Sequence, residues 1–287
     1  MKFIKVLRPW QWAKNILVVI PALLNKPFSL INIENAFLGF VLFSIFVSGN
    51  YILNDISDIE NDKAHPQKKF RPIANGSIDI KTAKIYSFVL ISLSSIGFYY
   101  FFDFAVLYLL IYLIFSILYT NYLKFNFVIN SLAISFFFLI RLFLGGFISE
   151  IEISFFLSAY IFFTSFFIAV MKKNSILNTT DIENNKYLNI VLKENSVLQL
   201  STLSLASLFL SNVALYVWGF ENYKASGQNS IQYLVLFLVL YFIFTFMLHQ
   251  SSNNGKLEDF VLGIFKDKKL IATSFLLGIS FLIYYFV

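Results

Sequence analysis

Three aspartates follow a long apolar segment of the chain, at Asp55, Asp58 and Asp62. Their spacing is i, i+3, i+7, which at about 3.6 residues per turn places all three carboxylates on one face of a helix. Carboxylates held this close together are difficult to keep ionised without a cation. Mg²⁺ prefers oxygen ligands and often shares its coordination shell between carboxylates and substrate phosphates. The spacing therefore predicts a magnesium site that also binds a phosphorylated substrate.

A group of cations comes directly after the aspartates, at Lys68, Lys69 and Arg71. Lysine and arginine neutralise phosphate oxygens, and a guanidinium group does so with two parallel hydrogen bonds. These cations can meet the oxygens that a carboxylate-bound metal does not reach. Residues 54–76 together predict a site for a magnesium-bound diphosphate.

The composition indicates the kind of protein that carries this site. Of the 287 residues, 58% are hydrophobic, only 13% are charged and 37 are Phe, and the mean hydropathy is +0.74. Soluble domains are about 25% charged. We therefore predict an all-α integral membrane protein in which residues 1–287 form a single domain. The absence of cysteine excludes thiolate metal ligands and a cysteine nucleophile.

Nine apolar stretches come near the length of a membrane-spanning helix, about 17–25 residues. Pro21 and Pro27 interrupt the first stretch. We interpret it as a retained helix and not a signal peptide, because no small-residue cleavage site follows it. The nine predicted spans are 15–31, 35–53, 83–102, 104–122, 127–148, 153–171, 197–218, 230–249 and 269–287.

The basic residues predict how these spans are oriented. With nine spans, every Lys and Arg falls on the side of the N-terminus except Lys26, Lys224 and the mid-span Arg141. Cytoplasmic loops carry the excess of Lys and Arg, so this side is the cytoplasm and the C-terminus lies outside the inner membrane. The net charge of +6 then faces phosphate groups and the inner leaflet, and it requires no nucleic-acid partner. The long polar loops on this side, where we expect the chemistry, are 54–82, 172–196 and 250–269.

Three motifs resemble those of a known family. The motif NDxxDxxxD at 54–62 resembles the first aspartate-rich motif of the UbiA superfamily of intramembrane prenyltransferases, which have nine transmembrane helices. The motifs HPxKxxRPIAxG at 65–76 and LRPxQWxKN at 7–15 are similar to those of one branch, the polyprenyl-phosphate (decaprenyl-phosphate) phosphoribosyltransferases. Weaker similarity occurs at Leu123-Lys124, at Arg141 with Gly145-Gly146, at Lys172-Lys173, and at Glu258-Asp259 with Asp267.

The resemblance implies a UbiA-like helical bundle and a magnesium-dependent transferase. Enzymes of this branch move 5-phosphoribose from phosphoribosyl diphosphate onto a polyprenyl phosphate, release diphosphate, and serve cell-envelope biosynthesis. The implied partners are these two substrates and the lipid bilayer. The implied metal ligands are Asp55, Asp58 and Asp62, with Lys68 and Arg71 as further catalytic groups. The implied substrate-binding residues are Lys14, Asn54, His65, Lys124, Asn130, Arg141 and Lys172.

Two positions depart from the pattern of this family. The family has an aspartate where this chain has Asn130, which accepts a hydrogen bond but contributes no charge. The family's Lys-Arg-x-x-Glu after the sixth span is replaced here by a segment without the acid, Lys172-Lys173-Asn174-Ser175-Ile176. These departures leave the donor substrate open, while the fold and the metal site are still implied.

Two alternatives to phosphoribosyl transfer remain open. The first is UbiA-type transfer from a prenyl diphosphate to an aromatic acceptor, which uses the same magnesium-diphosphate site. The second is a non-catalytic transporter, but transporters place ionisable residues and broken helices near the bilayer midplane. Here nearly all charge lies at one face of the membrane. The motifs at 7–15 and 65–76 favour phosphoribosyl transfer over prenyl transfer.

Overall fold

The computed structural model describes residues 2–24, 29–64, 68–179, 197–226, 231–254, 264–265 and 267–286. These residues form helices and no strand occurs among them, which confirms the all-α prediction. The helices divide between two compact units. Unit 1 comprises Met1–Lys124 and Phe137–Ile153, and unit 2 comprises Phe125–Phe136 and Ser154–Val287. The single domain expected from the sequence stays a prediction.

The described residues contain six helical stretches that are long and apolar enough to cross a membrane. One of them, Ile80–Asn121, comprises the two helices α5 (Ile80–Phe102) and α6 (Val106–Asn121). Large apolar side chains such as Phe88 (71%) and Tyr100 (79%) are exposed along these stretches, as expected where a helix faces lipid. The chain is therefore an integral membrane protein, as its composition predicted. The other stretches are Leu30–Ser57, Phe127–Ile148, Phe155–Ser175, Gln199–Lys224 and Ile231–Asn253.

The first predicted span, 15–31, is not one continuous helix. Its residues belong to a 3-10 helix, η1 (Pro9–Val18), and to the short helix α2 (Ile20–Leu24), while 25–28 lie outside the described residues. At about 1.5 Å per residue, α2 is far too short to cross a hydrocarbon core of about 30 Å. Nine spans thus remain a prediction, although α13 (Lys268–Phe286) coincides with the predicted ninth.

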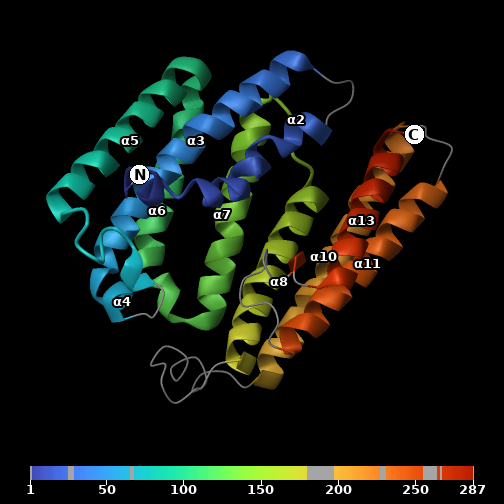
Figure 1. Ribbon diagram of the computed structural model, residues 1–287. Helices are drawn as coiled ribbons and strands as arrows, with labels where there is room; N and C mark the ends of the chain where they lie inside the picture. Colours follow the sequence, from blue (N-terminus) through green and yellow to red (C-terminus); the bar gives the residue numbers. More distant parts are fainter. Residues whose placement is uncertain are drawn as a thin grey trace. The chain divides into compact units, whose positions relative to one another are not determined.

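Unit 1 is built around α3 (Leu30–Ser57), which packs along α5 and against α6 (Figure 1). Its core contains Phe43, Phe46 and Phe98, each at most 1% exposed. The second part of α7 (Phe127–Ile148) belongs to this unit and the first part to unit 2. The shorter elements before α7 are α1 (Lys2–Leu7), α4 (Ile59–Ala64), η2 (Lys68–Phe70), η3 (Asp103–Ala105) and η4 (Leu123–Phe125).

Polar side chains fix where the two long helices of unit 1 begin. Ser29 Oγ accepts from the N–H of Asn32 (3.3 Å) at the start of α3, and Asp79 Oδ2 accepts from the N–H of Thr82 (2.9 Å) at the start of α5. Such caps satisfy backbone donors that have no partner within the helix. Hydrogen bonds from the side chain and backbone of Thr82 hold the pKa of Asp79 below its ordinary value. The cap of α5 is therefore a charged carboxylate at neutral pH.

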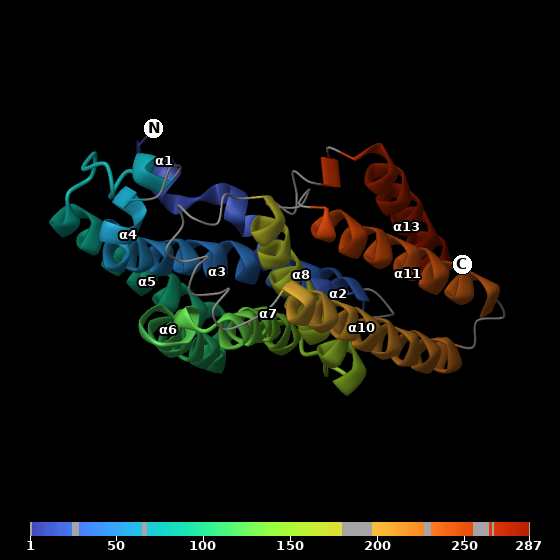
Figure 2. The same ribbon diagram turned by 90° about the horizontal axis from the view of Figure 1, so that it is seen from below.

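Unit 2 consists mainly of long helices: α8 (Phe155–Thr179), α10 (Val197–Ser226), α11 (Ile231–Asn253) and α13, with the first part of α7. α10 packs along α8, and α11 lies beside α13 in both views (Figures 1 and 2). Three serines of α10 are at most 3% exposed, namely Ser204, Ser207 and Ser211. Small side chains of this kind let membrane helices approach closely.

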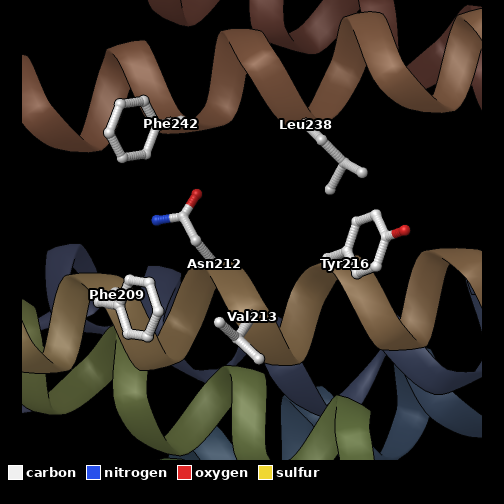
Figure 3. Close-up of a pocket in the computed structure, with 6 residues that line it drawn as sticks. All are labelled: Phe209, Asn212, Val213, Tyr216, Leu238 and Phe242. Atoms are coloured by element: carbon white, nitrogen blue, oxygen red, sulfur yellow. The ribbon is translucent and has the colours of Figure 1, made fainter.

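A groove of about 280 Å³ lies between α10 and α11 (Figure 3). Its lining contains no carboxylate and no cation, and its most exposed member, Phe209, is 64% exposed. Both helices are among those long and apolar enough to span a membrane. The charged chemistry of the chain must therefore be sought elsewhere. The lining residues are Phe209, Asn212, Val213, Tyr216, Leu238 and Phe242.

Cysteine labelling in cells tests the predicted orientation, because the native chain contains no cysteine. Ser77 and Asn254 are exposed and belong to predicted cytoplasmic loops. Ser77→Cys and Asn254→Cys are expected to stay unmodified when an impermeant thiol reagent is added to intact cells. Glu152→Cys, also exposed, follows the predicted span 127–148 on the opposite side and should react fully. The reverse labelling pattern would contradict the cytoplasmic placement of the loops.

Candidate active site

The helix that carries the aspartate motif ends within the motif. α3 ends at Ser57, and Asp58 is its C-cap with φ −99° and ψ 10°. α4 begins directly afterwards and carries Asp62. Backbone hydrogen bonds from Asp58 N–H to Asn54 O (3.0 Å) and from Asp62 N–H to Asp58 O (2.8 Å) bridge the break. The prediction of one continuous helix through all three aspartates is therefore wrong at Asp58.

Two arginines link two of the aspartates into one network. Asp55 Oδ1 accepts from Arg8 Nη2 and from Arg71 Nη1 (3.2 Å), and Asp62 Oδ2 accepts from the same Arg71 Nη1 (2.7 Å). Asp55 and Asp62 are only 6% and 2% exposed. Charges removed from water to this extent require opposite charges beside them, and the chain supplies two guanidinium groups.

The third aspartate, Asp58, pairs with a lysine that follows α6. Its Oδ1 accepts from Lys124 Nζ at 2.6 Å, and Lys124 lies in η4. Next to it, Asn54 Oδ1 accepts from Thr120 Oγ1 at 2.9 Å. These contacts tie the end of α3 to the end of α6. The structure therefore brings Lys124 and Asn54 together with the aspartate motif.

The donor chemistry of this cluster suits Mg²⁺, which prefers carboxylate and amide oxygens. Within the described ranges, no three His, Asp or Glu side chains converge in a way that could hold a metal ion. Guanidinium groups lie against Asp55 instead and act as stand-in cations. Coordination of Mg²⁺ by Asp55, Asp58 and Asp62 therefore requires these ion pairs to open.

The cluster has a small positive charge. Its three carboxylates face four cations, which gives a net charge of +1, and the cations are Arg8, Lys68, Arg71 and Lys124. Adding Mg²⁺ brings the total to about +3, which balances the roughly three negative charges of a diphosphate ester. Lys68 is exposed in η2, yet desolvation by surrounding atoms and, second, repulsion from Arg71 lower its pKa.

Arg8 also belongs to this cluster. From the motif at 7–15, the resemblance implied Lys14 as a substrate-binding residue but not Arg8. Its backbone has φ 51° and ψ 56°, a left-handed conformation that is uncommon for residues other than glycine. Its guanidinium lies 5.5 Å from the centre of the Tyr51 ring. Backbone strain of this kind clusters at functional sites. The sequence signal was the motif at 7–15, but nothing local connects Arg8 with Asp55.

Side chains of α3 hold the N-terminal segment in place. Ser48 Oγ donates to Leu7 O (2.7 Å) and accepts from Trp12 Nε1 (3.0 Å). Asn15 Nδ2 donates to Ser44 Oγ (3.0 Å), and Asn15 is 1% exposed. The LRPxQWxKN motif is thus attached to α3 at both of its ends.

Arg141 lies in α7 and is 3% exposed. Its Nε donates to Asn15 Oδ1 (2.9 Å), its Nη1 to Phe137 O (2.6 Å) and its Nη2 to Tyr112 OH (3.1 Å). Its guanidinium also lies 5.3–5.7 Å from the ring centres of Phe43, Tyr112 and Phe138. No carboxylate of the described residues forms an ion pair with it. Arg141 is therefore buried among neutral partners.

In unit 2, Lys173 lies beside Asn130. Its neighbour Lys172, which the resemblance implied as a substrate-binding residue, is exposed, and its role stays a prediction. Lys173 Nζ donates to Asn130 Oδ1 (2.8 Å), Phe127 O (3.2 Å) and Ser131 Oγ (3.3 Å). Of the described carboxylates, none forms an ion pair with Lys173. Three neutral oxygens thus accept hydrogen bonds from its amine.

The remaining predicted residues are less informative. Lys14 is exposed on η1. His65 lies outside the described residues, as does most of the loops 172–196 and 250–269, including Glu258-Asp259. Their predicted roles stay predictions.

Comparison with known proteins gives a family and named relatives. The model of the UbiA prenyltransferase family matches residues 16–266. A decaprenyl-phosphate phosphoribosyltransferase of Mycobacterium tuberculosis is 30% identical over 183 residues, which cover 62% of this chain and 61% of that protein. The protein of the same name from Mycolicibacterium smegmatis is 32% identical over 184 residues, covering 62% of this chain and 58% of that one. The chain thus spans 58–61% of the length of these two relatives.

A solved structure shares the fold. A UbiA homolog from Archaeoglobus fulgidus, bound to DMAPP and Mg²⁺, superposes with a TM-score of 0.72 at 15% identity. The match covers 100% of this chain and 98% of that chain. At this level of identity the likeness concerns the fold alone, and it confirms the UbiA-like fold that the motifs implied.

Proposed function

Because the chain belongs to the UbiA prenyltransferase family, we propose that it transfers 5-phosphoribose from phosphoribosyl diphosphate to a polyprenyl phosphate and releases diphosphate. The observation that carries this proposal is the network of Arg8, Asp55, Arg71 and Asp62 at the end of α3. With Lys68, Lys124 and Asp58 added, the charge of the cluster suits a magnesium-bound diphosphate. The names of the relatives and the motifs at 7–15 and 65–76 favour phosphoribosyl diphosphate as the donor.

The cluster can stabilise the departing diphosphate. Displacement at a sugar anomeric carbon develops positive charge on the sugar and negative charge on the leaving group. Mg²⁺, when held by the aspartates, supplies a Lewis acid for that negative charge. Lys68, in η2, and Arg71, the residue after η2, add positive charge. Asp58 holds Lys124 at the same cluster. Groups fixed in this way need no rearrangement as the charge develops.

The acceptor requires a cation but no strong base. A polyprenyl phosphate is already an anionic nucleophile, so its attack needs no proton transfer to a side chain. Repulsion between two anionic substrates must instead be offset by positive charge. In unit 2, Lys173, whose Nζ donates to Asn130 Oδ1 at 2.8 Å, is our candidate for binding the phosphate of the acceptor.

Two adjacent lysines test this assignment. Lys173→Met is expected to lower turnover by at least about tenfold, because it removes an amine that is held in one place by three hydrogen bonds. Lys172→Met should stay within about twofold of the wild type, since that side chain is exposed. Both variants make the same lysine-to-methionine change one residue apart, so initial rates separate the effect of position from that of the substitution. Loss of activity in Lys172→Met alone would support Lys172 as the substrate-binding residue instead.

The proposed reaction is tested on purified protein in detergent. The protein is incubated with Mg²⁺, phosphoribosyl diphosphate labelled in the ribose, and a polyprenyl phosphate. Label is expected in the organic phase, dependent on Mg²⁺ and on the lipid. No such transfer by a protein that still binds Mg²⁺ and diphosphate would contradict the proposal.

Prenyl transfer is the second candidate, because Asn130 departs from the phosphoribosyltransferase pattern. The solved UbiA homolog named above is bound to DMAPP, a prenyl diphosphate. A parallel incubation with labelled prenyl diphosphate and an aromatic acceptor distinguishes the two reactions. Label in a prenylated aromatic product, without ribose transfer, would establish this alternative.

A further inference from the structure

One carboxylate oxygen of Asp55, Oδ1, is already taken by two cations of the chain. Arg8 Nη2 and Arg71 Nη1 both donate to Asp55 Oδ1, and Asp55 is 6% exposed. A divalent ion cannot reach that oxygen without displacing at least one guanidinium, and it would be repelled by both. Mg²⁺ alone therefore competes with Arg8 and Arg71 for the same carboxylate.

Arg8 is the partner that is freer to leave. Arg71 also donates to Asp62 at 2.7 Å, so this second carboxylate holds Arg71 in place when its contact with Asp55 breaks. Arg8 makes no second ion pair with any described carboxylate, and its other neighbour is the ring of Tyr51 at 5.5 Å. The side chain of Arg8 is 16% exposed, so it can reach solvent and a ligand.

The backbone of Arg8 is fixed, so any movement is confined to its side chain. The preceding Leu7 O accepts from Ser48 Oγ at 2.7 Å, and the following Pro9 begins η1 with its φ restricted by its ring. A guanidinium on a fixed backbone can turn from a carboxylate to a diphosphate and bind two of its oxygens at once.

We propose that Arg8 couples the binding of Mg²⁺ to the binding of diphosphate. Without diphosphate, Arg8 neutralises Asp55 and weakens metal binding. A diphosphate anion draws the guanidinium to its own oxygens and so frees Asp55 for the metal. Metal and diphosphate then bind as a unit. This inference rests on the proposed diphosphate site, but not on which diphosphate ester is the substrate.

The proposal makes a prediction that a purely structural role does not make. Coupling between two ligands is reciprocal, so each tightens the other by the same factor. Removing Arg8 should tighten the binding of Mg²⁺ alone, because Asp55 loses a competing cation. It should weaken the binding of diphosphate, which loses a guanidinium. A residue that merely supported the fold would weaken both ligands when removed.

The test compares Arg8→Gln with the wild type and with Lys63→Gln. Lys63 offers the matched control because its side chain is 53% exposed and pairs on the surface with Glu60 at 2.9 Å. Purified protein in detergent is titrated calorimetrically with Mg²⁺, without and with saturating methylene diphosphonate, a diphosphate analogue that carries no group to transfer. A blank titration corrects for the complex that Mg²⁺ and the analogue form in solution.

In the wild type, the analogue is expected to tighten Mg²⁺ binding by at least about tenfold. Arg8→Gln should bind Mg²⁺ alone at least about fivefold more tightly and lose most of the coupling, while Lys63→Gln should keep the wild-type values. If Arg8→Gln does not fold, Arg8→Lys takes its place in the test. Lysine keeps the positive charge but cannot form two parallel hydrogen bonds, so we expect a partial loss of coupling.

Two results would overturn the proposal. One is unchanged or weaker binding of Mg²⁺ alone in Arg8→Gln, or full wild-type coupling in Arg8→Lys. The other is wild-type protein that binds Mg²⁺ equally well with and without the analogue. Neither measurement involves ribose transfer, so failure of the coupling and failure of the proposed reaction are distinguishable.

Discussion

Asp58→Asn is expected to reduce turnover by at least about 100-fold, the range for removing one electrostatic group from an active site. Asparagine keeps the shape of the side chain but lacks the charge that pairs with Lys124 and suits a metal. The fold should persist, because the Asp58 side chain is 30% exposed. The C-cap hydrogen bond of α3 uses the backbone N–H of Asp58, which the substitution retains. We therefore expect the Tm to stay within about 2 °C of the wild type.

Glu60→Gln provides the matched control for this change. Glu60 lies two residues further on, its side chain is 86% exposed, and among the described residues its ion pair is with Lys63 at the surface. Its substitution removes the same charge and should leave turnover at the wild-type level. Initial rates over a range of Mg²⁺ concentrations compare the two variants. If Asp58→Asn kept more than about a tenth of the activity, less than about 1.4 kcal/mol of transition-state stabilisation would be lost, which contradicts the assignment of Asp58 as a metal ligand.

Local patterns in the sequence were sufficient to predict most of the membrane helices. An apolar stretch of spanning length is recognisable by itself, without knowledge of its neighbours. The stretches 83–102 and 127–148 accordingly match α5 and α7 closely. The exception is 15–31, the stretch that Pro21 and Pro27 already interrupt in the sequence. The structure replaces that predicted span with the short elements η1 and α2.

The contacts that complete the site could not be predicted in this way. Arg8 and Asp55 are 47 residues apart, and only the packing of the N-terminal segment on α3 brings them together. The distinction between Lys172 and Lys173 has a similar origin. Adjacent residues of a helix point about 100° apart, so the packing of α8 decides which lysine meets Asn130. The motifs identified Arg71, Lys124 and the three aspartates, which make contact in the structure, but they did not select Arg8 or Lys173.

Arg141→Leu is expected to lose stability and activity together. The substitution leaves Asn15 Oδ1 and Tyr112 OH without the donors they now have, and both residues are at most 3% exposed. A buried polar group left without its partner costs about 1–3 kcal/mol. Thermal unfolding in detergent should therefore show a clear decrease in Tm.

The loss of activity is expected to act through the N-terminal segment. Asn15 joins Arg141 to Ser44 of α3 and lies in the segment that begins just after Arg8. Without the contact between Arg141 and Asn15, this segment can move and displace Arg8. A displacement of about 1 Å at an active site can lower the rate by about 100-fold. Direct contact with substrate is less favoured, because Arg141 is 3% exposed and a phosphate reaches it only if neighbouring side chains move. Arg141 is thus a candidate positioning residue.

Arg141→Lys and Tyr112→Phe separate these two roles. Lysine keeps the charge, but its single ammonium group cannot reach the three acceptors to which the planar guanidinium group of Arg141 donates in different directions. We expect Arg141→Lys to lower both Tm and kcat, the latter by about tenfold, without changing KM for either substrate. Tyr112→Phe removes only one hydrogen bond, worth about 0.5–1.5 kcal/mol, and should keep near wild-type turnover. A normal Tm with KM raised for a single anionic substrate in Arg141→Lys would instead identify Arg141 as a residue that binds that substrate directly.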